Sequence, residues 1–316
     1  MRTEFAFLFG AGASKALGAH VKPRTPPLMC ELYDELAEAF KKEWGKGSPF
    51  ERYADKFRKD FEQTFTEIVL KITSDYAFSG PALSLLEGLK PLALYFSRFV
   101  LDRIRMDYYS KLLDALGRAG NIPHTVFGLL NYECLFEQAA TRILNLPVDY
   151  WGADDGVRVA KLHGSSNFIA QIGQIERALL ASTPVQVELR VITLPVENLE
   201  KELGYKLLGG GRIEYLPIMS QVSHYKELLL APAAIQRMRN EWNAGVHDAK
   251  FIAIIGVSFN SYDQHIIEQI KNAPGTVLYI GDEASFKMWQ VVNKGAQWLG
   301  ERLEDGFDKL LTHLGM

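Results

Sequence analysis

The strongest constraint on the fold is an uninterrupted apolar run, Phe5–Phe9, that ends in a glycine turn. A run without polar alternation is typical of a strand covered on both faces, as in a parallel sheet. Gly10 and Gly12 follow at once, and Ser14 begins a segment that can form a helix. Glycines between a strand and a helix let the backbone approach a pyrophosphate, whose charge the helix N-terminus favours. A tight turn without a ligand is the structural alternative.

The same succession of apolar run and helical segment returns later in the chain. Further runs lie at Thr125–Leu130, Arg158–Leu162, Phe251–Ile255 and Val277–Ile280. Strands that alternate with helices indicate an α/β fold with a parallel sheet. We therefore predict a Rossmann-like, doubly wound sheet.

Helical spacing dominates from about residue 28 to about residue 120. Leu32, Leu36 and Phe40 step by four, and aromatic residues repeat that step over Tyr53–Phe65. Such spacing places the apolar side chains on one face of a helix. We predict a helical insertion over about 28–120 within one domain that spans the whole chain.

Polar residues stand at the ends of two predicted strands. Asn131 and Glu133 follow the run that ends at Leu130, and His163 follows Leu162. At the carboxyl edge of a parallel sheet these side chains face the ligand crevice. There an Asn can hold a water or a ribose hydroxyl, and a His has a pKa suited to general base catalysis near neutral pH. The alternatives are a helix N-cap at Asn131, with Glu133 in the first turn, and a structural histidine.

The last two strands are followed in the same way by small or acidic residues. Gly256 and Ser258 can contact phosphate or ribose through backbone N–H groups and a hydroxyl. Asp282 is of the type that accepts hydrogen bonds from ribose hydroxyls, and so is Asp263. Ordinary turn chemistry is the alternative at each of these positions.

Several classes of protein are made improbable by what the sequence does not contain. It has no CxxC, HExxH, GxxxxGK[ST] or GxSxG motif, and its two cysteines cannot form a four-thiolate zinc site. A formal net charge of -3 argues against nucleic-acid binding through bulk charge. The apolar runs are too short to span a bilayer. We expect a cytoplasmic protein without a bound metal and without nucleic-acid or membrane contacts.

In chain order, these elements resemble the sirtuin-like, or silent information regulator, superfamily. Gly10-Ala11-Gly12-Ala13-Ser14 is similar to its first NAD loop, and Asn131-Tyr132-Glu133 to its Asn-x-Asp segment. Lys161-Leu162-His163-Gly164 is similar to its Leu-His-Gly block, in which the histidine is catalytic. Gly256-Val257-Ser258 is similar to its Gly-Thr-Ser block.

The chain departs from the pattern of protein-deacylating sirtuins in three respects. The four zinc cysteines of protein-deacylating sirtuins are absent, and Arg24-Thr25-Pro26-Pro27-Leu28 stands where those enzymes have a Pro-Asp-Phe-Arg segment. Glu133 replaces the usual Asp. The first two departures, with the helical insertion, make the chain more similar to the zinc-ribbon-lacking NADases of bacterial anti-phage defence. This resemblance implies an NAD+ glycohydrolase that releases nicotinamide and ADP-ribose, acting as a homo-oligomer or with a separate sensor or partner protein.

The resemblance and the strand-end positions together assign roles to ten residues. Asn131 would orient the ribose or the attacking water, and His163 would act as the general base. The expected NAD-binding residues are Gly10, Ala11, Gly12, Ser14, Glu133, Gly256, Ser258 and Asp282. Two alternatives stay open, a non-catalytic NAD or ADP-ribose sensor or subunit of a defence complex, and an NAD-dependent protein deacylase. The glycine loop alone would also fit a dehydrogenase.

Overall fold

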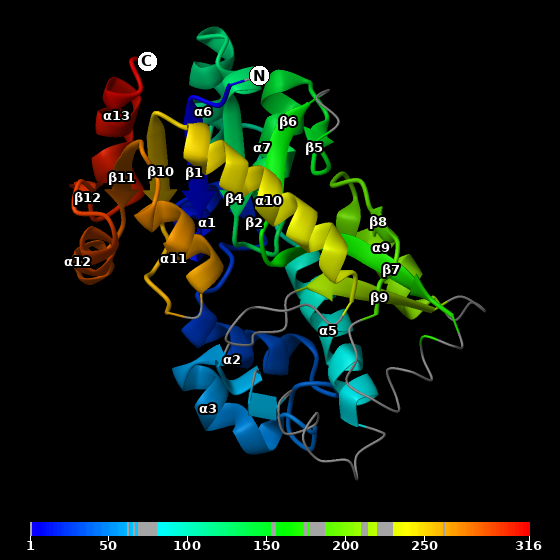
Figure 1. The fold of residues 1–316 in the computed structure, drawn as a ribbon. Helices are drawn as coiled ribbons and strands as arrows, with labels where there is room; N and C mark the ends of the chain where they lie inside the picture. Colours follow the sequence, from blue (N-terminus) through cyan, green and yellow to red (C-terminus); the bar gives the residue numbers. More distant parts are fainter. Residues whose placement is uncertain are drawn as a thin grey trace.

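The structure is a computed structural model centred on a seven-stranded sheet in the order β12-β11-β10-β1-β4-β6-β5 (Figure 1). Every pairing within this sheet is parallel. The structure describes residues 2–61, 63–65, 67–68, 81–152, 156–173, 176, 187–209, 214–219, 230–261 and 263–316. The strands are β1 (Phe5–Phe9), β4 (Thr125–Leu129), β5 (Val148–Asp149), β6 (Val157–Lys161), β10 (Phe251–Ile255), β11 (Thr276–Ile280) and β12 (Gln297–Gly300).

The apolar run at the start of the chain forms the central strand. All five residues of β1 are buried, and they pair in register with β4 on one side and β10 on the other. Phe7 stacks on Phe127 of β4, with ring centroids 5.4 Å apart. The prediction of a doubly covered strand in a parallel sheet is confirmed.

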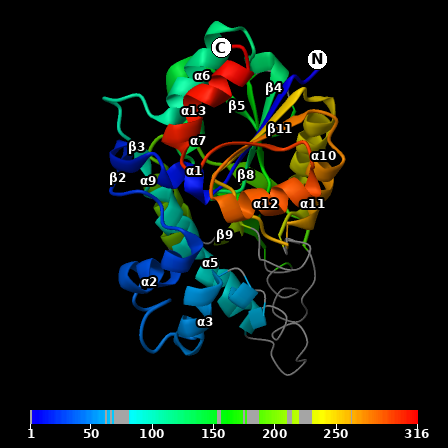
Figure 2. The ribbon, with the colours of Figure 1, turned by 90° about the vertical axis from the view of Figure 1, so that its left-hand side faces the viewer.

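Helices cover both faces of this sheet (Figures 1 and 2). One face carries α10, α11 and α12, and the other carries α6, α7 and α13. This layering confirms the predicted doubly wound α/β fold. The bounds are α6 (Tyr108–Arg118), α7 (Leu135–Leu144), α10 (Pro232–Asp248), α11 (Gln264–Lys271), α12 (Glu283–Val292) and α13 (Leu303–His313).

A second group of helices lies beyond the carboxyl ends of the strands, at the bottom of Figure 1. It consists of α2 (Met29–Ala39), α3 (Ala54–Lys59) and α5 (Pro81–Ser97). Tyr33 of α2 and Phe57 of α3 pack against Trp44, which lies in the segment between these two helices and stacks on Phe50 with ring centroids 4.3 Å apart. The step of four seen in the sequence therefore reflects packing within this group. The assignment of one domain with an insertion stays a prediction.

A small antiparallel sheet in the order β8-β7-β9 lies beside the main one and was not predicted. Val196–Ser223, which gave no clear pattern in the sequence, supplies α9 and β9, while Gly210 and Gly211 lie outside the described residues. No helix in the described part of the chain has the length and apolarity to cross a membrane. The remaining elements are α1 (Ala11–Lys15), β2 (Val21–Lys22), β3 (Val100–Leu101), β7 (Gly164–Ile172), β8 (Val191–Thr193), α9 (Leu199–Leu208), β9 (Glu214–Met219) and 3-10 helices at Gly18–His20, Glu51–Tyr53 and Ile122–His124.

Candidate functional site

A cavity of about 950 Å³ opens at the carboxyl edge of the main sheet. This volume lies near the upper end of the range for ligand pockets, about 300–1,000 Å³. This edge is also a topological switch point of the sheet. The chain passes from β1 to β4 on one side of β1, and the later strand β10 pairs with β1 on the other side. All the residues predicted from the sequence line this one cavity, namely Gly10, Ala11, Gly12, Ser14, Asn131, Glu133, His163, Gly256, Ser258 and Asp282.

The glycines hold two loops in backbone contact at the cavity wall. The N–H of Gly12 donates to the carbonyl of Gly256 at 3.0 Å. A Cβ on Gly10 would lie 2.5 Å from that same carbonyl oxygen, and one on Gly12 would lie 2.9 Å from Gly256 Cα. Gly256 itself has φ +62°, which favours glycine. These residues therefore shape a wall of bare backbone that a ligand can approach closely.

The N–H groups of this loop are largely engaged within the protein. Gly10 donates to the carbonyl of Ile255, and Ala13 to that of Gly10, both at 3.0 Å. The Gly12 N–H is also engaged, so Gly10 and Gly12 offer a ligand close approach to their backbone but no N–H donor.

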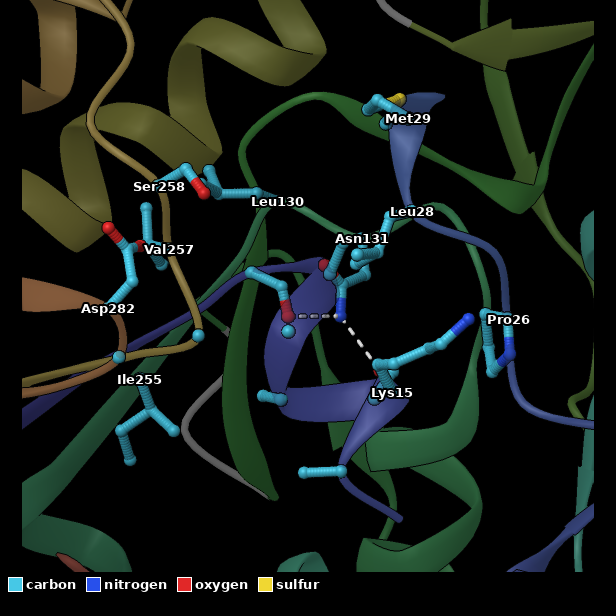
Figure 3. A pocket seen from close by; sticks show the side chains of 18 of the residues that line it. Lys15, Pro26, Leu28, Met29, Leu130, Asn131, Ile255, Val257, Ser258 and Asp282 are labelled. Carbon is cyan, nitrogen blue, oxygen red and sulfur yellow. Dashed lines mark hydrogen bonds between the residues drawn. The ribbon is translucent and has the colours of Figure 1, made fainter. Parts of the chain in front are cut away.

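Asn131 is tied to the glycine loop through its amide nitrogen (Figure 3). Its Nδ2 donates to the carbonyl of Gly10 at 3.1 Å and to Ser14 Oγ at 2.8 Å, and lies 3.2 Å from Glu133 Oε1. The amide oxygen, on the other branch of the side chain, is then the group that can accept from a ligand. The alternative of an N-cap at Asn131 is wrong, because α7 is preceded by Cys134 in that position.

Ser14 and Glu133 belong to a buried polar network beneath the cavity. Ser14 Oγ donates to Glu133 Oε1 at 2.5 Å and lies 3.0 Å from the hydroxyl of Tyr109. Burial raises the pKa of the Glu133 carboxyl, and the charge of Lys161 and the hydrogen bond from Ser14 oppose this only in part. Both side chains brace Asn131. The sequence gave no sign that Tyr109 would join them.

Lys161 is a fully buried cation behind this network. Its Nζ donates to the backbone carbonyl of Glu133 at 2.7 Å and lies 3.2 Å from Glu137 Oε1. Burial is the largest influence and lowers the pKa of Lys161, but the charges of Glu137, Cys134 and Glu133 and the hydrogen bond to Glu137 together outweigh it, so the net shift is upward. Removing one partner of such a buried pair lowers the free energy of unfolding by about 3–5 kcal/mol, because the other charge is left without compensation. The pair therefore favours the arrangement in which Lys161 contacts both Glu137 and the backbone of Glu133.

His163 lies at the end of β6, where the chain turns into β7. Gly164 makes that turn with φ +78°, and a Cβ there would lie 2.4 Å from the carbonyl oxygen of Ile218. The His163 side chain is 3% exposed, and its Nε2 lies 3.2 Å from Asp263 Oδ1. Asp263, considered above as a ribose acceptor, stands beside the candidate base instead.

Arg239 of α10 supports the same corner of the cavity. Its Nε donates to the carbonyl of Leu162 at 3.1 Å, directly before His163. Burial lowers the pKa of Arg239 to about 10, and the negative charge of Asp263 opposes that shift. His163 is thus fixed both through its backbone and through its ring. The sequence could not reveal this arrangement, because the three side chains come from three distant segments.

Ser258 and Asp282 lie near each other across the cavity from Lys15 and Leu28 (Figure 3). Asp282 Oδ1 accepts from the N–H of Ser285 at 2.8 Å and so caps α12. Capping of α12 therefore accounts in part for an aspartate at this position. Its exposed carboxylate still lies on the cavity edge.

The segment Pro26–Met29, which overlaps the stretch that replaces the deacylase Pro-Asp-Phe-Arg segment, forms a wall of the cavity. Glu31 holds it in place by accepting from the N–H of Leu28 at 2.8 Å and from Lys15 Nζ at 2.8 Å. The hydrogen bond from Lys15 and that from Leu28 lower the pKa of Glu31. The glycine loop and this wall are thereby linked.

Scanning with protein-family models and searching curated proteins both leave the chain without a match.

Proposed function

We propose that this chain binds NAD+ in the cavity and hydrolyses its nicotinamide–ribose bond. The observation that carries the proposal is the convergence of Asn131 and His163 with the interlocked glycine loops on one cavity at the switch point of the sheet. Ligands of doubly wound sheets bind at such a point. The volume of about 950 Å³ accommodates a dinucleotide.

The order of the strands suggests how the dinucleotide lies. Ser258 and Asp282 follow β10 and β11, whereas Asn131 and His163 follow β4 and β6. The glycine loop after β1 stands between these two pairs. We place the adenosine at the first pair, the pyrophosphate along the bare backbone, and the nicotinamide riboside at the second pair.

Cleavage of the C1′–nitrogen bond expels neutral nicotinamide and leaves an oxocarbenium-like ribose. Water then adds at C1′ and loses a proton, which gives ADP-ribose. Asn131, fixed through Nδ2, would direct its amide oxygen at the ribose or the water. Asp263 favours the proton on His163 Nε2 and leaves the lone pair on Nδ1 for proton abstraction. A positioned base is worth about 10²- to 10⁴-fold in rate.

The resemblance to the anti-phage NADases extends this proposal to the cellular role. We propose an NAD-depleting effector of the bacterial cytoplasm that works as a homo-oligomer or with a separate sensor or partner protein. Depletion of NAD would then be the means by which viral growth is stopped.

The test compares purified wild type with His163→Ala, Asn131→Ala and a control, His247→Ala, at an exposed position in α10. Nicotinamide release from NAD+ is followed by chromatography, and circular dichroism confirms that each variant folds. We expect the two site variants to lose at least 100-fold in rate and the control to match wild type. Equal rates in all four proteins would refute the assignment.

Two other outcomes distinguish the alternatives. Stoichiometric NAD+ binding by calorimetry, without nicotinamide release, would indicate a sensor. Release that depends on an added acetyl-lysine peptide, with O-acetyl-ADP-ribose as product, would indicate a deacylase.

A further inference from the structure

A compact group of metal-ligating side chains lies at one corner of the cavity. His163, Asp263 and His265 each offer one donor atom, and these atoms lie within 4.8 Å of one another. His163 Nε2 and Asp263 Oδ1 are 3.2 Å apart. The two imidazole rings have centroids 5.8 Å apart and are inclined by 54°.

These dimensions are close to those of a tetrahedral metal site. Zinc binds histidine nitrogen and carboxylate oxygen at about 2.0–2.2 Å, so two of its tetrahedral donors stand about 3.3 Å apart. The pair of His163 and Asp263 already has this separation. The remaining donor separations are at most 4.8 Å and would have to shorten when a metal binds. Two nitrogens and one oxygen suit zinc and similar transition metals better than magnesium or calcium.

The fold supplies a rigid frame and an open position. Asp263 directly precedes α11 and His265 lies in its first turn, whereas His163 comes from the end of β6. His163 and Asp263 both line the cavity, so a fourth position can be filled by water. The positive charge of Arg239 near Asp263 disfavours a second cation. The site therefore suits reversible occupation better than permanent retention.

We propose that His163, Asp263 and His265 form a reversible zinc site whose occupation silences His163 as a base. Zinc binding is inferred from the positions of the three donor atoms alone. The effect of zinc on His163 as a base rests on the proposed function. Zinc on His163 Nε2 leaves the one ring proton on Nδ1, so Nδ1 has no lone pair with which to accept a proton. The ion also adds positive charge where the oxocarbenium-like ribose would form. The sequence motifs predicted no metal, because the ligands come from segments a hundred residues apart.

The first experiment measures binding without reference to catalysis. Metal-free full-length chain is titrated with Zn²⁺ against a chromogenic chelator, for wild type, His265→Asn and the control His247→Asn. We expect one zinc per wild-type and control chain. Loss of a metal's outer-shell partner already costs about 10- to 100-fold in affinity, so loss of a ligand should cost at least tenfold. Wild type without stoichiometric zinc, or a His265→Asn variant with wild-type affinity, would overturn the site.

Cobalt substitution keeps this test valid if His265→Asn fails to fold. Co²⁺ bound to the wild-type chain should give the intense visible absorption of a four-coordinate site, and added Zn²⁺ should displace it. A weak, octahedral-type spectrum would overturn the proposed geometry.

The second experiment measures the consequence for NAD+ cleavage. Zinc should inhibit wild type and the His247→Asn control, and His265→Asn should cleave NAD+ at the wild-type rate with at least tenfold less sensitivity to zinc. Inhibition that is unchanged in His265→Asn would refute the regulatory role. If no protein cleaves NAD+ while zinc binding follows the expected pattern, the proposed function fails and the metal site stands.

Discussion

Replacing Gly256 with alanine perturbs the contact that joins the two loops of the cavity wall. Gly256 has φ +62°, and an added Cβ would lie 2.1 Å from the nitrogen of Ala13 and 2.5 Å from the carbonyl carbon of Gly12. Both neighbours are backbone atoms and cannot rotate away. The loops must therefore move apart.

Two terms set the size of the effect. Left-handed backbone costs a non-glycine residue about 1–2 kcal/mol. Insertion of a carbon into a closely packed region costs about 1–3 kcal/mol. We expect Gly256→Ala to lower the free energy of unfolding by about 2–5 kcal/mol, the sum of these terms, and to weaken NAD+ binding because the wall is displaced.

Gly18 offers a matched control. It has φ +56°, and its added Cβ would meet no atom within 4 Å. Gly18→Ala therefore carries the backbone term alone, about 1–2 kcal/mol, and should leave NAD+ affinity unchanged. Urea denaturation measures both unfolding free energies, and calorimetry measures both affinities. If the two variants agree within about 0.5 kcal/mol, less than the expected packing term, and bind NAD+ like wild type, the loop contact has no such role.

Three further substitutions test separate parts of the site. Because the pKa of Glu133 is raised in the folded chain, its stabilising contribution is complete below the ordinary value of 4.5 and is lost as pH rises through the folded value. Urea denaturation from pH 5 to 8 should therefore show Glu133→Gln gaining stability relative to wild type, and a constant difference would contradict the burial argument. Asp282→Ser keeps a capping oxygen for α12, so its unfolding free energy should stay within about 0.5 kcal/mol of wild type, at the low end of the loss for an uncapped helix. If the carboxylate holds the ribose, its NAD+ affinity should fall, and unchanged affinity would leave Asp282 as a cap alone. Asp263→Asn should reduce kcat for NAD+ cleavage by about 10²-fold, within the range that a positioned base supplies, with little change in KM. A rise in KM of similar size, with kcat unchanged, would instead indicate a role in binding.

The sheet and the site could largely be predicted because both follow from the order of strands. β1, β4, β10 and β11 are short apolar runs, and parallel strands bring their carboxyl ends to one edge. Polar residues that follow such runs must therefore meet there. This is why Asn131 and His163, far apart in the sequence, line one cavity.

The antiparallel sheet could not be predicted, because its longest strand, β7, begins with glycine and polar residues instead of an apolar run. β7 begins at Gly164, which reads as a bend, and continues through Ser165, Ser166 and Asn167. These polar side chains are fully buried, and Asn167 donates to the carbonyl of Leu194 at 3.2 Å. Periodicity of apolar residues does not reveal a strand whose buried positions are polar.

The partners of the candidate catalytic residues were missed for a different reason. Asp263 and Arg239 contact the His163 corner from α11 and α10, and Tyr109 reaches Ser14 from α6. Each contact depends on how helices pack over the sheet. No local sequence pattern encodes that packing.

Incubation of the purified chain with NAD+, with every product quantified, decides whether the cavity hydrolyses NAD+. We expect nicotinamide and ADP-ribose in equal amounts, matching the NAD+ consumed. Full recovery of NAD+ that is demonstrably bound to the chain, with and without zinc chelation, would contradict it.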